Sequence, residues 1–295
     1  MFTFILLLLV VLPLLHFLMI SPDRKRMMPG NSLCGRSYAH RGLHSLRNQV
    51  PENSLQAFSY AASRGYGIEL DVRLSADGQV VVFHDDNLSR MTDDPRLVSA
   101  VTYEELRTLS LNGTSQTIPL FSEALEVIGG RVPLLIELKP GANRDELCRK
   151  VWELLQGYEG DYAVQSFDPR SLNWFRRNAP QVWRGQLSTN LRLSSPSMNP
   201  ILAWALTNLY MNFLSRPHFV SYDVNFFGNR NLRSLRVRHG MASAAWTVDN
   251  TNDYENVVKY AQMIIFEGIL PPIRFDDSRS GVTRRERTPA GGKRR

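Results

Sequence analysis

The sequence predicts an α/β fold, a (β/α)8 TIM barrel with a small insertion after the hairpin of its second strand and one transmembrane helix before the barrel. Two observations predict the barrel. Short strand-like apolar runs alternate with helical patterns, and 295 residues with 43% hydrophobic content suffice for one large core. A third observation, a long apolar run at the start of the chain, predicts the membrane helix.

The first segment is apolar from Phe2 to Ile20 except at Thr3 and His16. A helix of that length spans about 28 Å, close to the thickness of the hydrocarbon core of a bilayer. Basic residues follow the run at 24–26 and no small-residue cleavage motif is present, which favours an uncleaved anchor over a secretory signal. The positive-inside rule then predicts a single-pass membrane protein whose catalytic part lies in the cytoplasm.

Composition divides the chain into an anchor and three further parts. Two cysteines, Cys34 and Cys148, exclude a fold that depends on a disulfide framework. Short runs rich in Pro, Gly, Ser and Asn separate the anchor from the first strand-like run. The expected parts are a transmembrane anchor at 1–22, a linker at 23–36, a barrel at 37–275 with its insertion at about 86–119, and a basic disordered tail at 276–295.

The net charge of +7 is concentrated at the end of the chain, where residues 279–295 hold seven basic residues and one acidic residue. The remaining body is nearly neutral, which argues against a groove that binds nucleic acid. Two interpretations of the tail stay open: it is simply solvated, or it is attracted to anionic lipid headgroups.

The sequence contains nine strand-like runs, but a barrel of this type has eight strands. Asp77-Gly78 lies between two of them and predicts a two-residue hairpin turn, so the third run is a returning arm of the second. In that register Ser75 faces Val80, and Asp71 faces His84. The expected runs are 37–41, 67–75, 79–84, 133–139, 162–167, 183–188, 219–224, 242–248 and 263–267.

Helices between these strands are expected to begin after residues that often cap helices or start them. The eighth helix is poorly defined. Because the active site of such a barrel lies at the carboxyl ends of its strands, polar residues at those ends are candidates for function. The expected helix starts follow Asn53, Phe121, Asn143, Asp168, Pro200, Asn229 and Asn252.

Three carboxylates point in one direction from two neighbouring strand ends. Glu69 and Asp71 are two residues apart, so they share one face of a strand, and Glu137 shares a face with Lys139. Carboxylates brought together repel one another unless a cation neutralises them, and oxygen ligands favour a hard divalent ion. The sequence therefore predicts a site for Mg²⁺ or Ca²⁺ at Glu69, Asp71 and Glu137.

Two histidines and two basic side chains lie close to these carboxylates in the predicted barrel. His40 and His84 can exchange protons near neutral pH, while Arg41 and Lys139 can bind phosphate. Taken singly, each of these residues is more simply a salt bridge or a structural polar group. Their convergence at one rim of the barrel favours hydrolysis of a phosphodiester, which needs charge neutralisation and proton transfer. Which histidine is the acid stays open.

These motifs resemble the glycerophosphodiester phosphodiesterase family. The resemblance rests on His40-Arg41-Gly42, Pro51-Glu52-Asn53-Ser54, Glu69-Leu70-Asp71-Val72, Asp77-Gly78 with His84-Asp85, and Glu137-Leu138-Lys139. Gln165-Ser166-Phe167 and Trp246-Thr247-Val248 look like later strand motifs of the family and suggest Phe167 and Trp246 as pocket residues. The last strand exit, 264–271, departs from the usual pattern, which puts contacts of the last loop with substrate in doubt.

The resemblance implies a phosphoric diester hydrolase on a barrel. It implies that Glu69, Asp71 and Glu137 bind the divalent cation and that His40 and His84 act as acid and base. It further implies that Arg41 and Lys139 hold phosphate and that the insertion helps to receive the glycerol end. Attack by water and attack by a hydroxyl of the substrate itself both remain possible routes.

The nature of the substrate depends on an apolar segment at 201–214, which is short for a membrane span. One interpretation places it in the membrane interface with Trp204 and Tyr210 at the boundary. The others are a buried barrel helix or a dimer contact. The first favours a lysophospholipase D acting on lysophospholipids. Either of the others favours soluble glycerophosphodiesters, cleaved to glycerol 3-phosphate and an alcohol. An inactive membrane-tethered binding module is the alternative from another class.

Overall fold

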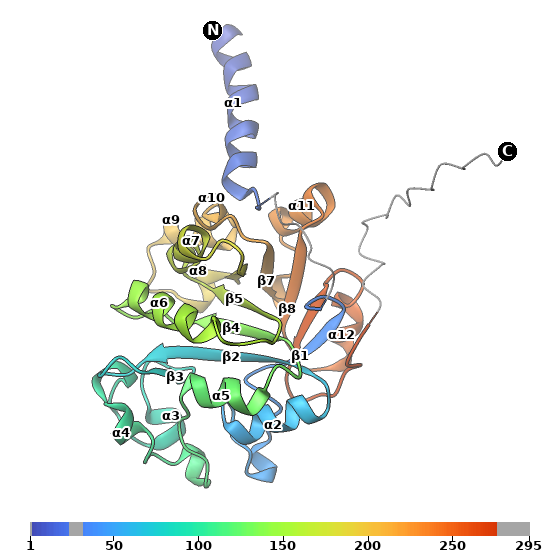
Figure 1. Ribbon diagram of the computed structural model, residues 1–295. Coiled ribbons are helices and arrows are strands. Elements are labelled where there is room, and N and C mark those ends of the chain that lie inside the picture. The colour runs from blue at the N-terminus through green and yellow to red at the C-terminus, as the bar shows by residue number, and fades with distance from the viewer. Residues whose placement is uncertain (1, 24–31, 276–295) are drawn as a thin grey trace, which may run out of the picture.

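The computed structural model describes residues 2–23 and 32–275, and its centre is a closed barrel of eight parallel strands (Figure 1). The strands pair in the order β1-β2-β4-β5-β6-β7-β8-β9, and β9 pairs with β1 to close the ring. The predicted TIM barrel is therefore confirmed. Its strands are β1 (Arg36–Ala39), β2 (Gly67–Leu74), β4 (Leu134–Leu138), β5 (Tyr162–Ser166), β6 (Trp183–Ser188), β7 (Phe219–Asp223), β8 (Ala242–Val248) and β9 (Met263–Phe266).

The ninth strand, β3 (Val80–Val82), is the returning arm of β2, as predicted, but the predicted register is wrong by one residue. Leu74, not Ser75, faces Val80, and the amide of Phe83, not of His84, donates to the carbonyl of Asp71. The reason is the turn, which has three residues between the paired positions 75 and 79. Gly78 adopts φ +73° there, a left-handed conformation that suits glycine.

Alternation along the strands explains which side chains enter the barrel. In β4, Leu134, Ile136 and Leu138 pack into the large apolar cluster beneath the helices, whereas Leu135 packs into a second cluster with residues of β1, β5, β7, β8 and β9. Since successive side chains point to opposite faces, Glu137 follows Leu135 inward. The same alternation in β2 sends Glu69 and Asp71 inward.

Helices cover the outside of the barrel, and most begin at polar caps. The side chains of Ser54, Asp168 and Asn229 each accept a hydrogen bond from a backbone amide in the first turn. The predicted starts agree to within about two residues; the last helix is capped by Asn250 rather than Asn252. The covering helices are α2 (Leu55–Ser63), α5 (Phe121–Ile128), α6 (Arg144–Leu155), α7 (Pro169–Asn178), α11 (Arg230–His239) and α12 (Thr251–Val257).

Residues 86–119 form a compact unit that follows the hairpin (Figure 1). Leu88, Met91, Val98 and Leu106 bury their side chains in a small apolar cluster that includes Val81 of β3. This separate cluster packs the unit against β3. Its short helices are α3 (Ser89–Thr92), η3 (Val98–Ala100), α4 (Tyr103–Leu106) and η4 (Leu111–Gly113); η2 (Leu46–Asn48) precedes α2, and η5 (Val224–Phe226) follows β7.

Three short helices, α8 (Leu191–Ser194), α9 (Pro200–Thr207) and α10 (Asn212–Ser215), stand between β6 and β7. The apolar segment at 201–214, expected to be one helix, is thus divided. Leu209 interrupts it with a positive φ of 62°. Leu191, Ala203 and Leu206 form an apolar cluster of their own, separate from the barrel core.

The helix α1 (Phe2–Ile20) projects away from the barrel, and its lower end lies beside α10 (Figure 1). Asn212 Nδ2 donates to the backbone carbonyl of Ile20 at 3.3 Å, and His16 Nδ1 lies 3.1 Å from the hydroxyl of Tyr210. Directly after α1, the carboxylate of Asp23 lies 3.1 Å from the guanidinium of Arg184, a side chain with 0% exposure. Among the residues the structure describes, no helix is long and apolar enough for a membrane crossing. The expected tail lies outside the described residues.

Candidate active site

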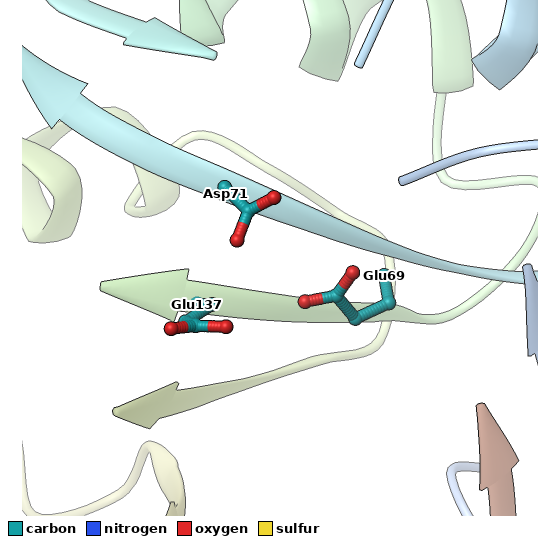
Figure 2. A group of neighbouring side chains, drawn as sticks. All are labelled: Glu69, Asp71 and Glu137. Atoms are coloured by element: carbon teal, nitrogen blue, oxygen red, sulfur yellow. The ribbon is translucent and has the colours of Figure 1, made fainter. Parts of the chain in front are cut away.

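The three predicted metal ligands meet inside the barrel. Glu69 and Asp71 come from β2 and Glu137 from β4, and Figure 2 shows their carboxylates turned toward a common space. One oxygen from each lies within 4.8 Å of the others, and all three side chains are buried. Among the described residues, this is the arrangement of acidic groups suited to hold a metal ion. The structure thus brings together the carboxylates that the sequence pattern selected.

Donors from three other parts of the chain fix these carboxylates. Asn53 Nδ2 donates to Asp71 at 2.8 Å, and Gln165 Nε2 donates to Glu69 at 3.3 Å. The backbone amide of Arg41 donates to the other oxygen of Glu69 at 3.2 Å. Neither Asn53 nor Gln165 was predicted to contact a metal ligand. The motifs that contain them were recognised, but the contacts depend on the tertiary fold.

Burial and mutual repulsion act strongly on the protonation of this cluster. Burial, together with the charges of Asp71 and Glu137, raises the pKa of Glu69 well above its ordinary value. Burial also raises the pKa of Glu137, to about 7. Burial alone would raise the pKa of Asp71, but Lys139, His84 and Arg41 hold it well below its usual range. Without a bound cation, ionising all three carboxylates at once is therefore energetically unfavourable.

The two predicted phosphate ligands lie at the site, paired with carboxylates. Lys139 Nζ is 2.8 Å from Glu137 and 3.2 Å from Asp71. The guanidinium of Arg41 donates to Glu52 at 2.7 Å and lies 3.7 Å from Asp71. Burial lowers the pKa of Lys139, but the neighbouring carboxylates outweigh it and raise the pKa overall. Both side chains therefore carry positive charge beside the acidic cluster.

His84 enters the site from the loop after β3, with its ring held by a chain of ionic contacts. Its Nδ1 lies 2.6 Å from Asp85, and Asp85 accepts a hydrogen bond from Arg90 at 2.6 Å. Arg90 also donates to Glu52, the partner of Arg41. Burial lowers the pKa of His84, so its imidazole is mostly neutral near pH 7.

His40 enters from the end of β1, and its partner was not predicted. Its Nδ1 lies 2.7 Å from the carboxylate of Glu267, the residue that follows β9. The hydrogen bond from His40 lowers the pKa of Glu267 to about 2, so this carboxylate is ionised at neutral pH. Glu267 could have been noticed in the sequence, because it lies in the strand exit that departs from the family pattern. Its pairing with His40 could not be predicted, because it depends on β9 lying beside β1.

Replacing Glu267 with Gln should lower kcat by about 10- to 100-fold, the scale typical of a partner that orients a functional histidine. The amide keeps the shape of the side chain but loses the charge that orients His40. Steady-state kinetics, with a calorimetric titration of the metal, would measure this. The control is Glu255→Gln, which changes an exposed carboxylate on α12. A full loss of metal affinity with unchanged kcat per bound metal would contradict the role.

A cavity of about 120 Å³ contains these groups. His40, Arg41, His84 and Lys139 line it together with Glu69 and Glu137. The predicted pocket residues Phe167 and Trp246 form part of its wall, with their rings edge to face at 5.7 Å between centroids. The buried indole nitrogen of Trp246 makes no hydrogen bond to any described residue.

The profile of the glycerophosphoryl diester phosphodiesterase family matches residues 40–270, which include every one of these side chains. The chain belongs to this family. It is therefore a phosphoric diester hydrolase that acts on glycerophosphodiesters, as the motifs predicted.

Named relatives agree with this assignment. A glycerophosphodiester phosphodiesterase of Caldanaerobacter subterraneus is 30% identical over 75% of this chain and 88% of its own length. One from Bacillus altitudinis is 36% identical, but the match spans 49% of this chain and 63% of that enzyme. A rat lysophospholipase D is 35% identical over only 38% of this chain and 39% of its own length.

Solved structures share the barrel of this phosphodiesterase. A phosphodiesterase of Oleispira antarctica, in complex with the product sn-glycerol-3-phosphate, has 25% identity and a TM-score of 0.65. The match covers 79% of this chain and 93% of that one. A glycerophosphodiester phosphodiesterase of Thermotoga maritima has 26% identity and a TM-score of 0.61, over 78% of this chain and 93% of that one.

The acidic cluster of the phosphodiesterase fits a hard divalent cation. Its donors are all carboxylate oxygens, and the amide oxygen of Gln165, buried beside Glu69, has no hydrogen-bond partner among the described residues. Lys139 and Arg41 supply two positive charges to three carboxylates, which leaves a net negative charge for a cation to neutralise. The cation would hold the buried carboxylates in the ionised state, which burial disfavours when no metal is bound.

Proposed function

We propose that this phosphodiesterase cleaves a glycerophosphodiester to glycerol 3-phosphate and an alcohol at a cation held by Glu69, Asp71 and Glu137. The observation that carries the proposal is the convergence of these three buried carboxylates at a cavity that Glu69, Glu137 and two imidazoles line. Their oxygen-only donor set favours Mg²⁺ or Ca²⁺ over Zn²⁺. When bound, such a cation polarises the phosphoryl oxygens and lowers the pKa of coordinated water.

We assign different tasks to the two histidines. His84 is the base, because burial lowers its pKa and leaves the ring neutral and able to accept a proton. His40 is the acid, and the carboxylate of Glu267, 2.7 Å from its Nδ1, orients the ring for proton transfer. The carboxylate partner of His84, Asp85, is itself paired with Arg90.

The side chains of Lys139 and Arg41 are proposed to bind the phosphate. Both already lie beside the acidic cluster and line the cavity with their positive charges. A phosphate oxygen that approaches the cavity adds negative charge where these two groups can exchange part of their carboxylate contacts for it. The buried Trp246 indole nitrogen supplies a further donor to the substrate.

We further propose that the apolar segment Phe2–Ile20 anchors the enzyme in a membrane with the barrel on the cytoplasmic side, although α1, like the other described helices, falls short of the length and apolarity of a membrane span. Support comes from the apolar sequence at Phe2–Ile20, from the basic cluster that follows it, and from the projection of α1 away from the barrel. Epitope tags at the two ends of the chain, tested for protease access in sealed cells and in lysed cells, would check this orientation. A tag after the barrel that is digested in sealed cells would contradict it.

The enzymatic proposal is tested by metal removal. The purified full-length protein should release glycerol 3-phosphate from glycerophosphocholine when Mg²⁺ or Ca²⁺ is present, and should lose this activity in EDTA. Readdition of one of these ions, each titrated separately, should restore it and show which is preferred. Undiminished release in excess EDTA would contradict the role of the carboxylate cluster.

A further inference from the structure

A second, larger cavity of about 780 Å³ adjoins the catalytic one. His84, Lys139, Phe167 and Trp246 line both cavities, so the two spaces meet at the catalytic residues. The volume lies within the range typical of sites for small ligands. A molecule whose phosphorus lies at the acidic cluster can therefore extend one end directly into this groove.

The far wall of the groove is made by the segment between β6 and β7 and is largely apolar, although Thr189, Ser194 and Ser195 also line it. Charged side chains in the lining stand near the catalytic end, where Arg170 is paired with Asp168 at 2.8 Å. Methionines in the wall suit an adaptable apolar surface, because their side chains are flexible and polarisable. The wall residues are Leu191, Met198, Leu202, Leu206, Met211 and Leu214.

The helix α9 has two apolar faces with different surroundings. Ala203 and Leu206 are buried in the small cluster under the groove, and Leu202 contributes to the groove itself with 43% exposure. Ile201 and Trp204 face away, with 77% and 48% exposure. An apolar groove beside an exposed apolar helix face is a combination expected where a lipid passes between a surface and a site.

The exposed face lies next to α1. The ring of Trp204 is 4.9 Å from the ring of Tyr210, and the hydroxyl of Tyr210 contacts His16 of α1. The same neighbourhood includes the contact between Asn212 and the end of α1. Leu214, which lines the groove, lies in α10, the helix that contacts the lower end of α1 (Figure 1).

We propose that this groove binds the single acyl chain of a lysophospholipid while its phosphodiester occupies the catalytic cavity. The inference rests on the proposed function and names its substrate class. In the reaction, an oxygen from water bonds to phosphorus, and the bond from phosphorus to the headgroup oxygen breaks. The proton lost by water is balanced by the proton gained by the leaving alcohol, so lysophosphatidylcholine yields lysophosphatidate and choline.

A soluble glycerophosphodiester needs only the small cavity, since it has no apolar part to bury. This difference makes the groove separable from catalysis. Choline release would be measured with the full-length protein reconstituted in phosphatidylcholine vesicles, supplied with Mg²⁺ or Ca²⁺. The substrates would be glycerophosphocholine and lysophosphatidylcholines with six, eight and ten acyl carbons, used below their micelle-forming concentrations.

With the wild-type chain, kcat/KM should rise up to about fourfold for each methylene that the groove buries. Partition into the vesicles also favours longer chains, so paired variants are needed. Leu202→Asp places a charge in the groove, whereas Ile201→Asp places the same charge on the adjacent exposed residue of the same helix. Leu202→Asp should lower kcat/KM for the ten-carbon substrate at least about tenfold more than Ile201→Asp does.

Hydrolysis of glycerophosphocholine reports on catalysis alone, and its kcat/KM should be the same in the two variants. Equal losses on the long-chain substrate, or a wild-type rate independent of chain length, would overturn the groove assignment while leaving the phosphodiesterase intact. No choline from any substrate would instead overturn the proposed function. If Leu202→Asp fails to fold, Leu202→Gln with the wild-type series decides the same question.

Discussion

Replacing Glu69 with Gln is expected to lower kcat/KM by about 10³-fold or more and to weaken binding of Mg²⁺ or Ca²⁺ in parallel. The amide has nearly the same shape, but it removes one of three charges that hold the cation, and metal catalysis supplies several kcal/mol of stabilisation. The hydrogen-bond acceptors change as well, because Gln165 and the amide of Arg41 both donate to Glu69. Steady-state kinetics and calorimetric metal titration would measure the two losses.

The matched control is Glu153→Gln, which changes a half-exposed carboxylate of α6 that pairs with Arg149 at 2.6 Å. It should retain activity and metal affinity, since an exposed pair of this kind contributes little. Thermal unfolding monitored by circular dichroism would show that both variants fold. A Glu69→Gln protein with undiminished turnover would remove Glu69 from the proposed ligand set.

Replacing His84 with Ala is expected to lower kcat by about 10² to 10⁴-fold, the usual contribution of a general acid or base. Its pH profile should change too. A base must be unprotonated to act, and burial puts the pKa of His84 below its ordinary value of 6.5. The acid limb of the wild-type kcat/KM profile should therefore lie below pH 6.5, and the variant should lose it.

Two measurements separate this catalytic role from a structural one. The His84→Ala protein should keep its metal affinity and its unfolding temperature, because no predicted metal ligand is altered. Added imidazole should restore part of the lost rate by occupying the space left by the ring. An unchanged acid limb in the variant would show that another group accepts the proton.

The convergence of the three carboxylates could be predicted from their spacing along each strand and from the order of neighbouring strands in a barrel. Residues two apart on a strand share a face, and Glu69, Asp71 and Glu137 sit at the carboxyl ends of neighbouring strands. The partner of His40, in contrast, comes from a distant part of the chain. Glu267 reaches His40 only because the last strand closes the barrel against the first, a contact that no local pattern contains.

The register of the hairpin and the shape of the segment 201–214 show a second limit. Asp77-Gly78 correctly indicated a turn, but turns of two and of three residues differ by one step in register, and that difference lies in the backbone at Gly78. In the apolar segment, composition could not reveal the break at Leu209. The break separates α9 from α10 and leaves room for the groove between them and the catalytic rim.

The contact between Asp23 and Arg184 has a practical consequence for any shortened form of this enzyme. Arg184 is wholly enclosed at the base of the barrel, where backbone carbonyls of Val182 and Arg216 also accept from its guanidinium. Removing a carboxylate from an enclosed charge costs several kcal/mol. A shortened chain that begins at Ser21 keeps the contact between Asp23 and Arg184, whereas one that begins after Asp23 loses it. The first form should therefore be the more stable of the two.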